Sequence, residues 1–310
     1  MLINRTKHLR EYFDTNIKPH LVRLEKYMKI QQYALPISVL AFIAILFDIF
    51  MIFMGIVFLV GIISVLFTNS YVKKTYKNQV MLPLISQLGE GFDFEYEKGL
   101  EEKDLRDSKL VNLYGLKELH FSKLTRYKEQ ERTLYFSHLK LTTQYEDADN
   151  ELKTETSQAL LFKAATKMKI TKTTIIRPDL AQRVAGFVGE ISQNKEYNRL
   201  QKIRLDSPDF EERFIVYSED TIEAHYLLNH TVMERLSELE KAYPELGFLI
   251  SFTPGTLYIC VFLDWLEPHI ALNKEAVASY DSIKQDFELI FSLIDTLHAI
   301  ERHHLVGLDS

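Results

Sequence analysis

An apolar run of 34 residues, from Ala34 to Phe67, constrains this chain more than any other feature of its sequence. Its one charged residue is Asp48. A run of about 18 or more apolar residues is typical of a membrane-spanning helix. As a single helix the run would extend about 51 Å, well beyond the roughly 30 Å of a bilayer's hydrocarbon core. We therefore predict two short spanning helices, Ile30–Phe47 and Ile52–Asn69, joined by a tight turn at Asp48–Met51.

Basic residues flank the apolar run on both sides. Residues 1–32 carry Arg5, Lys7, Arg10, Lys18, Arg23, Lys26 and Lys29, and the exit side carries Lys73, Lys74 and Lys77. Basic flanks remain in the cytoplasm. A helical hairpin brings both ends out on the same side, so the two basic flanks agree with it. The lipid bilayer is the first predicted partner, and the soluble part of the chain is predicted to be cytoplasmic.

The fold class predicted for the whole chain is α+β. We expect an N-terminal cytosolic helix over residues 1–32 with an interruption at Pro19, a transmembrane helical hairpin over 33–69, and a juxtamembrane helix over 70–100. A β-rich cytosolic α+β domain with C-terminal helices follows over 101–310. In the juxtamembrane helix, an apolar face is predicted from residues spaced by four: Val72, Tyr76, Val80, Leu84 and Leu88.

Alternating apolar residues and turn signals predict the strands of the last segment. They are expected at Arg132–Gln144, Ala159–Thr166, Met168–Ile176, Ile203–Leu205 and Arg213–Tyr217, with a hairpin of Gly247–Phe252 and Thr256–Leu263 around Pro254-Gly255. Helices are expected at Glu101–Ser108, Thr221–Asn229, Thr231–Tyr243 and Tyr280–Ile300.

Composition and missing motifs narrow the function. The net charge of −6 gives no basic excess of the kind that marks a nucleic-acid binder. The single cysteine, Cys260, allows no internal disulfide, and its apolar surroundings predict a buried position. The sequence contains no phosphate-binding glycine loop, dinucleotide fingerprint, zinc-spaced set or nucleophile elbow. We therefore predict no catalytic residue, no metal and no cofactor, and a role other than enzyme is favoured.

The segment from Glu211 to Glu223 is the densest in polar side chains. A strand ending at Tyr217 and a helix beginning after Asp220 would bring backbone donors and carboxylates together, as in a ligand site. Tyr217, Asp220 and Glu223 are therefore candidate binding residues, and Asp206 in the preceding turn is the fourth. Helix capping and turn formation explain the same residues without a ligand.

The same region carries a family resemblance. The segments concerned are Arg204–Phe210, Phe214–Asp220, Glu223–Leu228, Met233–Leu236, Ser251-Phe252, Gly255–Ile259 and Trp265–Pro268, with weaker matches at Phe136–Leu139 and Leu161–Lys163. Together they resemble the bacterial membrane-protein family catalogued as domain of unknown function 3137, over most of residues 70–300. The resemblance implies two close membrane spans, a cytosolic domain and a bacterial inner-membrane location, and it implies no mechanism.

Three functional hypotheses remain open at this point. The first is a membrane-anchored scaffold or regulatory protein that presents a cytosolic interaction domain to a protein partner. It could also associate with itself, because Gly55 and Gly61 permit close helix packing. The second is a ligand sensor or enzyme with a site near Tyr217–Glu223. The third is a transport component that uses Asp48, which would require an oligomer.

Overall fold

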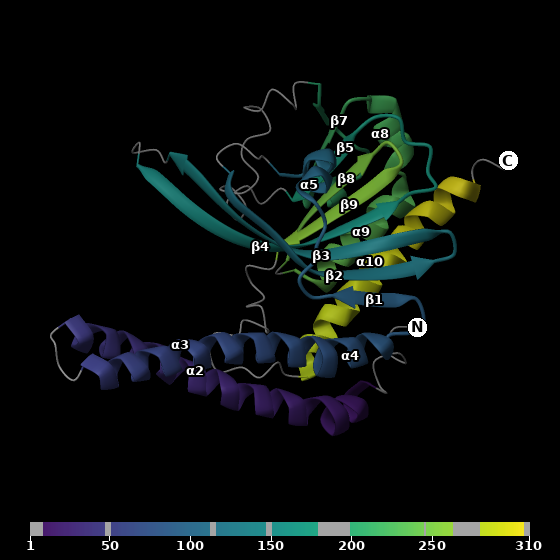
Figure 1. Ribbon diagram of the computed structural model, residues 1–310. Coiled ribbons are helices and arrows are strands. Elements are labelled where there is room, and N and C mark those ends of the chain that lie inside the picture. The colour runs from purple at the N-terminus through teal and green to yellow at the C-terminus, as the bar shows by residue number, and fades with distance from the viewer. Residues whose placement is uncertain are drawn as a thin grey trace. The chain divides into compact units, whose positions relative to one another are not determined.

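The computed structural model describes residues 9–46, 51–111, 116–146, 151–178, 199–244, 246–262 and 280–306. The chain forms two compact units, drawn in Figure 1. The helical unit comprises Met1–Glu90 with His269–Gln285, and the sheet unit comprises Gly91–Pro268 with Asp286–Ser310. The described part is α+β, with an antiparallel sheet and a C-terminal helix.

The helical unit contains two long helical segments. The first runs from residue 9 through a π-helical turn, η1 (Phe13–Ile17), into α2 (Lys18–Leu46). The second joins α3 (Met51–Thr75), a π-helical segment η2 (Tyr76–Met81) and α4 (Leu82–Ser86). One helix in the described ranges, Gly55–Ser86, is long and apolar enough to cross a membrane, so the predicted pair of spans is not confirmed. Asp48 and its predicted turn lie outside the described residues.

The predicted interruption at Pro19 is wrong, because the helix continues through it. Proline lacks the N–H that would close an ordinary helical turn, and its ring crowds the preceding turn. A π-helical turn ends just before Pro19, and the Lys18 N–H bonds to the Phe13 carbonyl five residues back. The same arrangement precedes Pro83, where the Leu82 N–H bonds to the Lys77 carbonyl. In both places a wider turn lets the proline enter a continuing helix.

Helices α2 and α3 lie side by side along a seam of small residues (Figure 1). A Cβ placed on Gly61 would lie 1.9 Å from Ser38 Oγ, and that hydroxyl donates to the Ala34 carbonyl at 2.7 Å. Aromatic pairs flank this contact, with ring centroids 4.8 Å apart at Tyr27–Tyr71 and 5.3 Å apart at Phe42–Phe58. The expected close packing at Gly61 therefore occurs within one chain.

The described strands of the sheet unit form one antiparallel sheet in the order β1-β2-β3-β4-β9-β8-β5-β7-β6. Their bounds are β1 Phe92–Glu95, β2 Leu116–Glu129, β3 Arg132–Glu146, β4 Leu152–Ala165, β5 Thr174–Pro178, β6 Gln201–Ile203, β7 Phe214–Ser218, β8 Gly247–Thr253 and β9 Thr256–Phe262. The helices of the unit are α5 Glu102–Ser108, α7 Pro208–Glu211, α8 Thr221–Leu227, α9 His230–Ala242 and α10 Tyr280–Val306, which joins the unit from Asp286 onward.

Each face of this sheet is buried over part of its area. Figure 1 shows α5 in front of the sheet and α9 and α10 behind it. The α5 side packs a core that includes Leu105, Leu139, Leu161 and the buried Cys260, as predicted for that cysteine. Alternation along a strand sends neighbouring residues to opposite faces, so Phe136 and its β4 partner Phe162 lie on the other side. Along β3 the buried apolar residues therefore change from one face of the sheet, at Phe136, to the other face, at Leu139.

Most predicted elements are confirmed with shifts at their ends, the largest at β4, which begins at Leu152 instead of Ala159. These are the strands at Arg132–Gln144, Ala159–Thr166 and Arg213–Tyr217, the hairpin around Pro254-Gly255, and the helices at Glu101–Ser108, Thr221–Asn229, Thr231–Tyr243 and Tyr280–Ile300. The predicted strand Met168–Ile176 begins only at Thr174. The helix expected over residues 70–100 ends at Ser86, and β1 follows it.

Candidate functional site

The structure gives two of the four predicted binding residues local structural contacts. Asp220 caps α8, because its Oδ1 accepts the Glu223 N–H at 2.9 Å. The Glu223 carboxylate turns away from this cap and accepts the N–H groups of Thr171 and Lys172 at 3.0 and 2.9 Å. Carboxylate contacts therefore replace strand pairing just before β5, which explains why that strand begins late.

The other two predicted residues lie apart from this cap. Tyr217 is half-buried on β7, where the Arg177 guanidinium carbon is 5.8 Å from its ring centre. Asp206 is exposed in the bend between β6 and α7. Neighbouring Glu219 accepts the Thr173 N–H at 3.1 Å and lies 3.3 Å from Lys109 Nζ. The polar groups of this segment thus hold loops and caps together, and a ligand site here stays a prediction.

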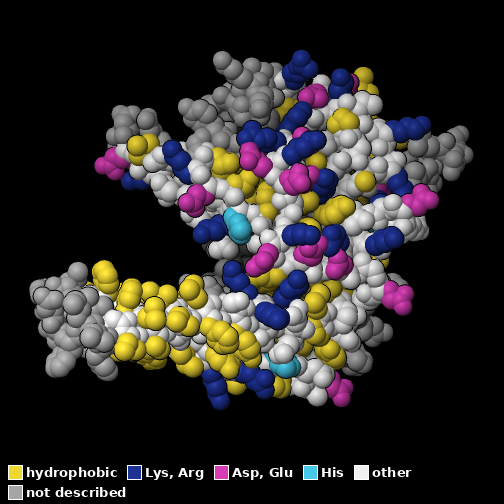
Figure 2. All heavy atoms as spheres, viewed as in Figure 1, with side chains coloured by type: hydrophobic (Ala, Val, Ile, Leu, Met, Phe, Trp, Pro, Cys, Tyr) yellow, Lys and Arg dark blue, Asp and Glu magenta, His cyan; other side chains and the backbone are white. Residues whose placement is uncertain are grey.

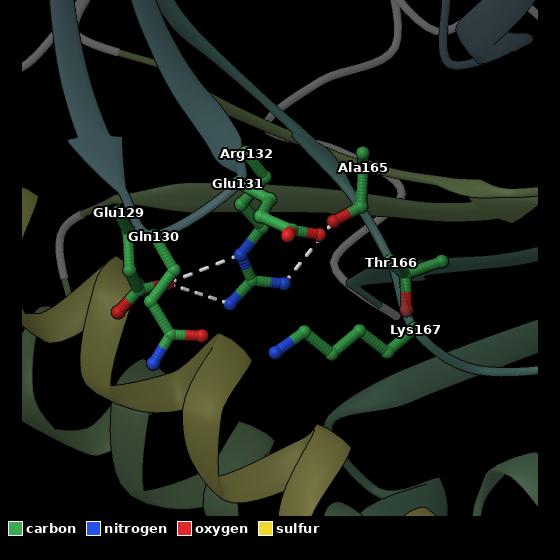
Figure 3. Close-up of a pocket in the computed structure, with 7 residues that line it drawn as sticks. All are labelled: Glu129, Gln130, Glu131, Arg132, Ala165, Thr166 and Lys167. Carbon is green, nitrogen blue, oxygen red and sulfur yellow. Dashed lines mark hydrogen bonds and ion pairs between the residues drawn. The ribbon is translucent and has the colours of Figure 1, made fainter.

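A cavity lies at a different place, beside the turn between β2 and β3. Its volume is about 330 Å³, and Figure 3 shows its lining residues: Glu129, Gln130, Glu131, Arg132, Ala165, Thr166 and Lys167. Gln130 has a left-handed φ of 51°, which makes the tight turn between the paired residues Glu129 and Arg132. The ends of the Gln130, Arg132 and Lys167 side chains point toward one another across the cavity.

Arg132, which lines the cavity, is also the centre of a network of charged side chains. Its guanidinium donates to Glu129 Oε2 through Nε at 3.1 Å and Nη2 at 2.8 Å. Nη1 donates to Glu301 Oε1 at 2.6 Å and to the Ala165 carbonyl at 3.2 Å. Only 11% of the Arg132 side chain and 6% of that of Glu301 are exposed. A nearly buried cation is thus held by two carboxylates, the pairing such a charge requires.

The network continues into α10 and β4. His298 Nε2 lies 2.6 Å from Glu129 Oε1, and Glu301 Oε1 also accepts the Lys167 N–H at 3.0 Å. Burial alone would raise the pKa of Glu129, but hydrogen bonds from His298 and Arg132 hold it below its usual value. The carboxylate therefore remains ionised, and the network ties the β2–β3 turn and the end of β4 to the C-terminal helix.

These residues could bind a small polar molecule at the open side of the cavity. The Lys167 ammonium and the Gln130 amide can donate, and the Glu131 carboxylate and the Ala165 carbonyl can accept. Sequence reasoning missed the site because Arg132 and Glu301 are 169 residues apart. Within the described ranges, no group of three or more His, Cys, Asp or Glu could hold a metal ion.

A second polar cluster fastens α5 over the front of the sheet. Lys163 Nζ on β4 lies 2.5 Å from Asp104 Oδ1 on α5, and Tyr258 is its neighbour on β9. Burial, with the carboxylates of Asp104 and Asp107 nearby, raises the pKa of Tyr258 to about 12. The phenol therefore stays neutral, and the cluster anchors a helix.

The helical unit has a different kind of surface, because α2 and α3 expose large apolar side chains. Apart from Val22 near the start of α2, the residues concerned are Ile30, Tyr33, Leu35, Ile37, Val39, Leu40, Phe42 and Ile43 on α2, and Ile56, Leu59, Val60, Ile62, Ile63, Leu66 and Phe67 on α3. Figure 2 shows hydrophobic side chains, in yellow, gathered along this part of the helices on the face in view. An apolar patch of this extent is typical of a surface that meets a membrane or another protein.

Comparisons with known proteins place part of the chain in a family. Residues 158–299 match the family described as Protein of unknown function (DUF3137). Over that range the chain is similar to the members of this family. The predicted resemblance is confirmed there, and its predicted extension upstream to residue 70 lies outside the match. The DUF3137 region contains Asp206, Tyr217, Asp220 and Glu223, whereas Glu129, Arg132 and Glu301 fall outside it.

Other comparisons are distant. The crystal structure of the mycobacterial trehalose monomycolate transport factor A, TtfA, is similar with 11% sequence identity and a TM-score of 0.35, and the match covers 67% of this chain and 88% of that chain. No curated protein matches this sequence.

Proposed function

We propose that this chain is a scaffold or regulatory protein, anchored in the bacterial inner membrane through α2 and α3, that presents the sheet unit to a protein partner in the cytoplasm. The observation that carries the proposal is the exposed apolar surface of α2 and α3. Leu40, Leu66 and Phe67 are each about two-thirds exposed (66%, 66% and 67%), which is costly in water and favourable in lipid.

The flanking charges support a hairpin with both ends in the cytoplasm. Lys18, Lys26 and Lys29 precede the apolar part of α2, and Lys73 and Lys74 follow that of α3. Only one cluster of cations would remain in the cytoplasm if α3 crossed alone. Two antiparallel crossings keep both clusters there.

Carbonate extraction of cell membranes tests the anchor. The full-length chain should remain in the membrane pellet at high pH, because burial of α2 and α3 in lipid does not depend on surface charge. Release into the supernatant would refute an integral anchor.

Single cysteines test the topology of the hairpin. In a Cys260→Ser background, Lys18→Cys and Lys74→Cys should react with a membrane-impermeant maleimide only after the inner membrane is opened. Asp48→Cys should react without opening it, in cells whose outer layers admit the reagent. Labelling of Lys18→Cys or Lys74→Cys in intact cells would contradict the hairpin and indicate a single crossing.

Purification tests the scaffold role. The full-length chain, cross-linked in cells and purified in mild detergent, should retain a protein in stoichiometric amount. A chain recovered alone or with a small molecule would contradict this role.

A ligand sensor is the second candidate function, and the cavity at Arg132 favours it. The side chains of Gln130, Arg132 and Lys167 meet there above a buried charge network (Figure 3). A small molecule that co-purifies with the wild-type chain and is lost from a Lys167→Glu variant would support this function. Retention of the small molecule by the Lys167→Glu variant would exclude the cavity as its binding site.

A further inference from the structure

Cationic side chains from both helices gather at one level of the helical unit. The Tyr27–Tyr71 contact, with ring centroids 4.8 Å apart, places these two positions of α2 and α3 beside each other. Lys26 precedes Tyr27 directly, and Lys73 and Lys74 follow Tyr71 by two and three residues. All three lysines are exposed. Two segments far apart in the sequence therefore supply one group of positive charges, here called the lysine collar (Lys26, Lys73 and Lys74).

The collar lies just outside the exposed apolar surface. Ile30 is four residues from Lys26, and Phe67 is six residues from Lys73. At a rise of about 1.5 Å per residue, these separations correspond to roughly 6 Å and 9 Å along the helices. If the apolar surface lies in the hydrocarbon core, lysines at these separations lie at the level of the lipid headgroups. Tyr27 and Tyr71 lie at the same level, as aromatic residues do at a membrane interface.

Few acidic groups neutralise these charges. Lys18–Leu46 and Met51–Ser86 together contain Lys18, Arg23, Lys26, Lys29, Lys73, Lys74 and Lys77, and their one acidic residue is Glu25. Glu25 lies 2.9 Å from Lys29 Nζ, which is outside the collar. The collar therefore adds to a positive field at the level where a leaflet would present its headgroups.

We propose that the lysine collar binds the headgroups of anionic phospholipids in the cytoplasmic leaflet. This inference rests on the proposed membrane anchor and names its lipid partner. Each lysine near an anionic surface strengthens the attraction several-fold, and two helices joined at Tyr27–Tyr71 present three of them together. The collar would thus both hold the anchor at a fixed depth and select its lipid surroundings.

The test compares lipid binding by full-length variants in bilayer discs. Discs of phosphatidylcholine with increasing phosphatidylglycerol would carry the wild-type chain, and lipids kept through detergent extraction would be counted by mass spectrometry. We expect enrichment of phosphatidylglycerol over phosphatidylcholine that weakens in high salt. Lys26→Gln/Lys73→Gln/Lys74→Gln should reduce this enrichment at least about tenfold. The corresponding Arg triple variant should preserve it.

A matched control removes the same charge elsewhere. Lys117→Gln/Lys140→Gln/Lys202→Gln changes three exposed lysines of the sheet unit and should leave the enrichment unchanged. Equal enrichment in the collar variant and the wild type would overturn the proposal, as would no preference in the wild type. Carbonate extraction separates this failure from failure of the anchor, because the collar variant should still remain in the membrane pellet.

Discussion

The two units of this chain place the same side chains in opposite environments. In the helical unit Phe42 and Phe67 are 47% and 67% exposed, whereas in the sheet unit Phe162 and Phe252 are completely buried. In the helical unit many large apolar side chains of α2 and α3 face outward, and the small residues Gly61 and Ser38 meet between these helices. The sheet unit does the reverse and adds ion pairs at its edges. The contrast agrees with the proposed anchor, in which lipid surrounds the helices and water surrounds the sheet unit.

The difference extends to what holds each unit together. Lipid tails are as apolar as leucine, so helices in a bilayer gain little from burying apolar surface and depend on close packing. The contact of Gly61 with Ser38 is of that kind. The sheet unit depends on water to drive its phenylalanines inside. Mutations in one unit should therefore leave the other intact, and the predictions below test this independence.

The largest effect is expected in the sheet core. Phe162→Ala would leave a cavity where the ring packs against Phe136, with centroids 4.9 Å apart, and should cost the sheet unit about 3–5 kcal/mol. Loss of amide protection in β3 and β4, measured by hydrogen exchange, would report it. Carbonate extraction should not change. Release of this variant from the membrane would show that the units are not independent.

The next effect is expected at the charge network. Glu301→Gln leaves Arg132 nearly buried with one of its two carboxylates missing, and should cost roughly 3 kcal/mol. Thermal unfolding of the sheet unit measures this cost. Glu238→Gln, at an exposed pair with Arg235, is the matched control and should cost less than about 1 kcal/mol. Equal losses in both variants would show that the network stabilises the sheet unit no more than an exposed ion pair does.

An overpacking effect is expected at the helix seam. Gly61→Leu would force a side chain into the contact with Ser38 and should cost about 1–3 kcal/mol. Cross-linking of Tyr27→Cys to Tyr71→Cys in a Cys260→Ser background should fall sharply, while sheet amides stay protected. Gly55→Leu is the control, because nothing lies within 4 Å of a Cβ there. Undiminished cross-linking in Gly61→Leu would refute the seam.

A pH effect is expected at His138. Burial, with the Lys123 ammonium nearby, lowers its pKa to about 3, so the folded state keeps it neutral. Below about pH 6.5 the unfolded chain binds a proton that the folded chain does not, and at pH 5 this costs about 2 kcal/mol. Denaturant unfolding of His138→Leu should therefore show a gain relative to wild type between pH 8 and pH 5.

Asp286 acts in the opposite direction and complicates the wild-type profile. Burial, opposed by Lys123, raises its pKa to about 6. Its contribution to stability is present in acid and is lost as the pH rises toward 6. The comparison of His138→Leu with wild type keeps Asp286 constant. An identical pH slope in the two proteins would contradict the assignment to His138.

The smallest effect is expected at the helix cap. Asp220→Ala removes the acceptor for the Glu223 N–H and should cost about 1 kcal/mol, whereas Asp220→Asn should cost less. Thermal unfolding of the sheet unit provides the measurement. A loss of partner or ligand binding in Asp220→Ala without a loss of stability would restore Asp220 as a binding residue.

Elements with one dominant signal could be predicted from the sequence. The apolar run, the face of α10 and the Pro254-Gly255 hairpin each contain residues whose spacing or backbone preference leaves little choice. Strand β2 was missed because Leu116, Leu119 and Phe121 do not alternate cleanly. A β-bulge between Ser122 and Thr125, with Lys123 at a φ of 52°, shifts its register.

The polar clusters could be predicted only in part. The cap at Asp220 is local, and the sequence indicated it. Glu223 was predicted as a candidate binding residue, but its carboxylate contacts Thr171, which lies 52 residues earlier. Arg132 and Glu301 are farther apart still, and only the antiparallel sheet and α10 bring them together. Contacts of this kind depend on topology, which local spacing does not encode.

The Arg132–Glu301 pair also has a consequence for synthesis of the chain. Arg132 is made 169 residues before its buried partner Glu301 on α10. During translation the hairpins of the sheet can form early, but Arg132 gains its partner Glu301 only after α10 has been made. A chain that stops before Glu301 would therefore lack one of the two carboxylates that hold Arg132 and would have an unfinished sheet unit, a form that quality-control proteases could recognise and remove.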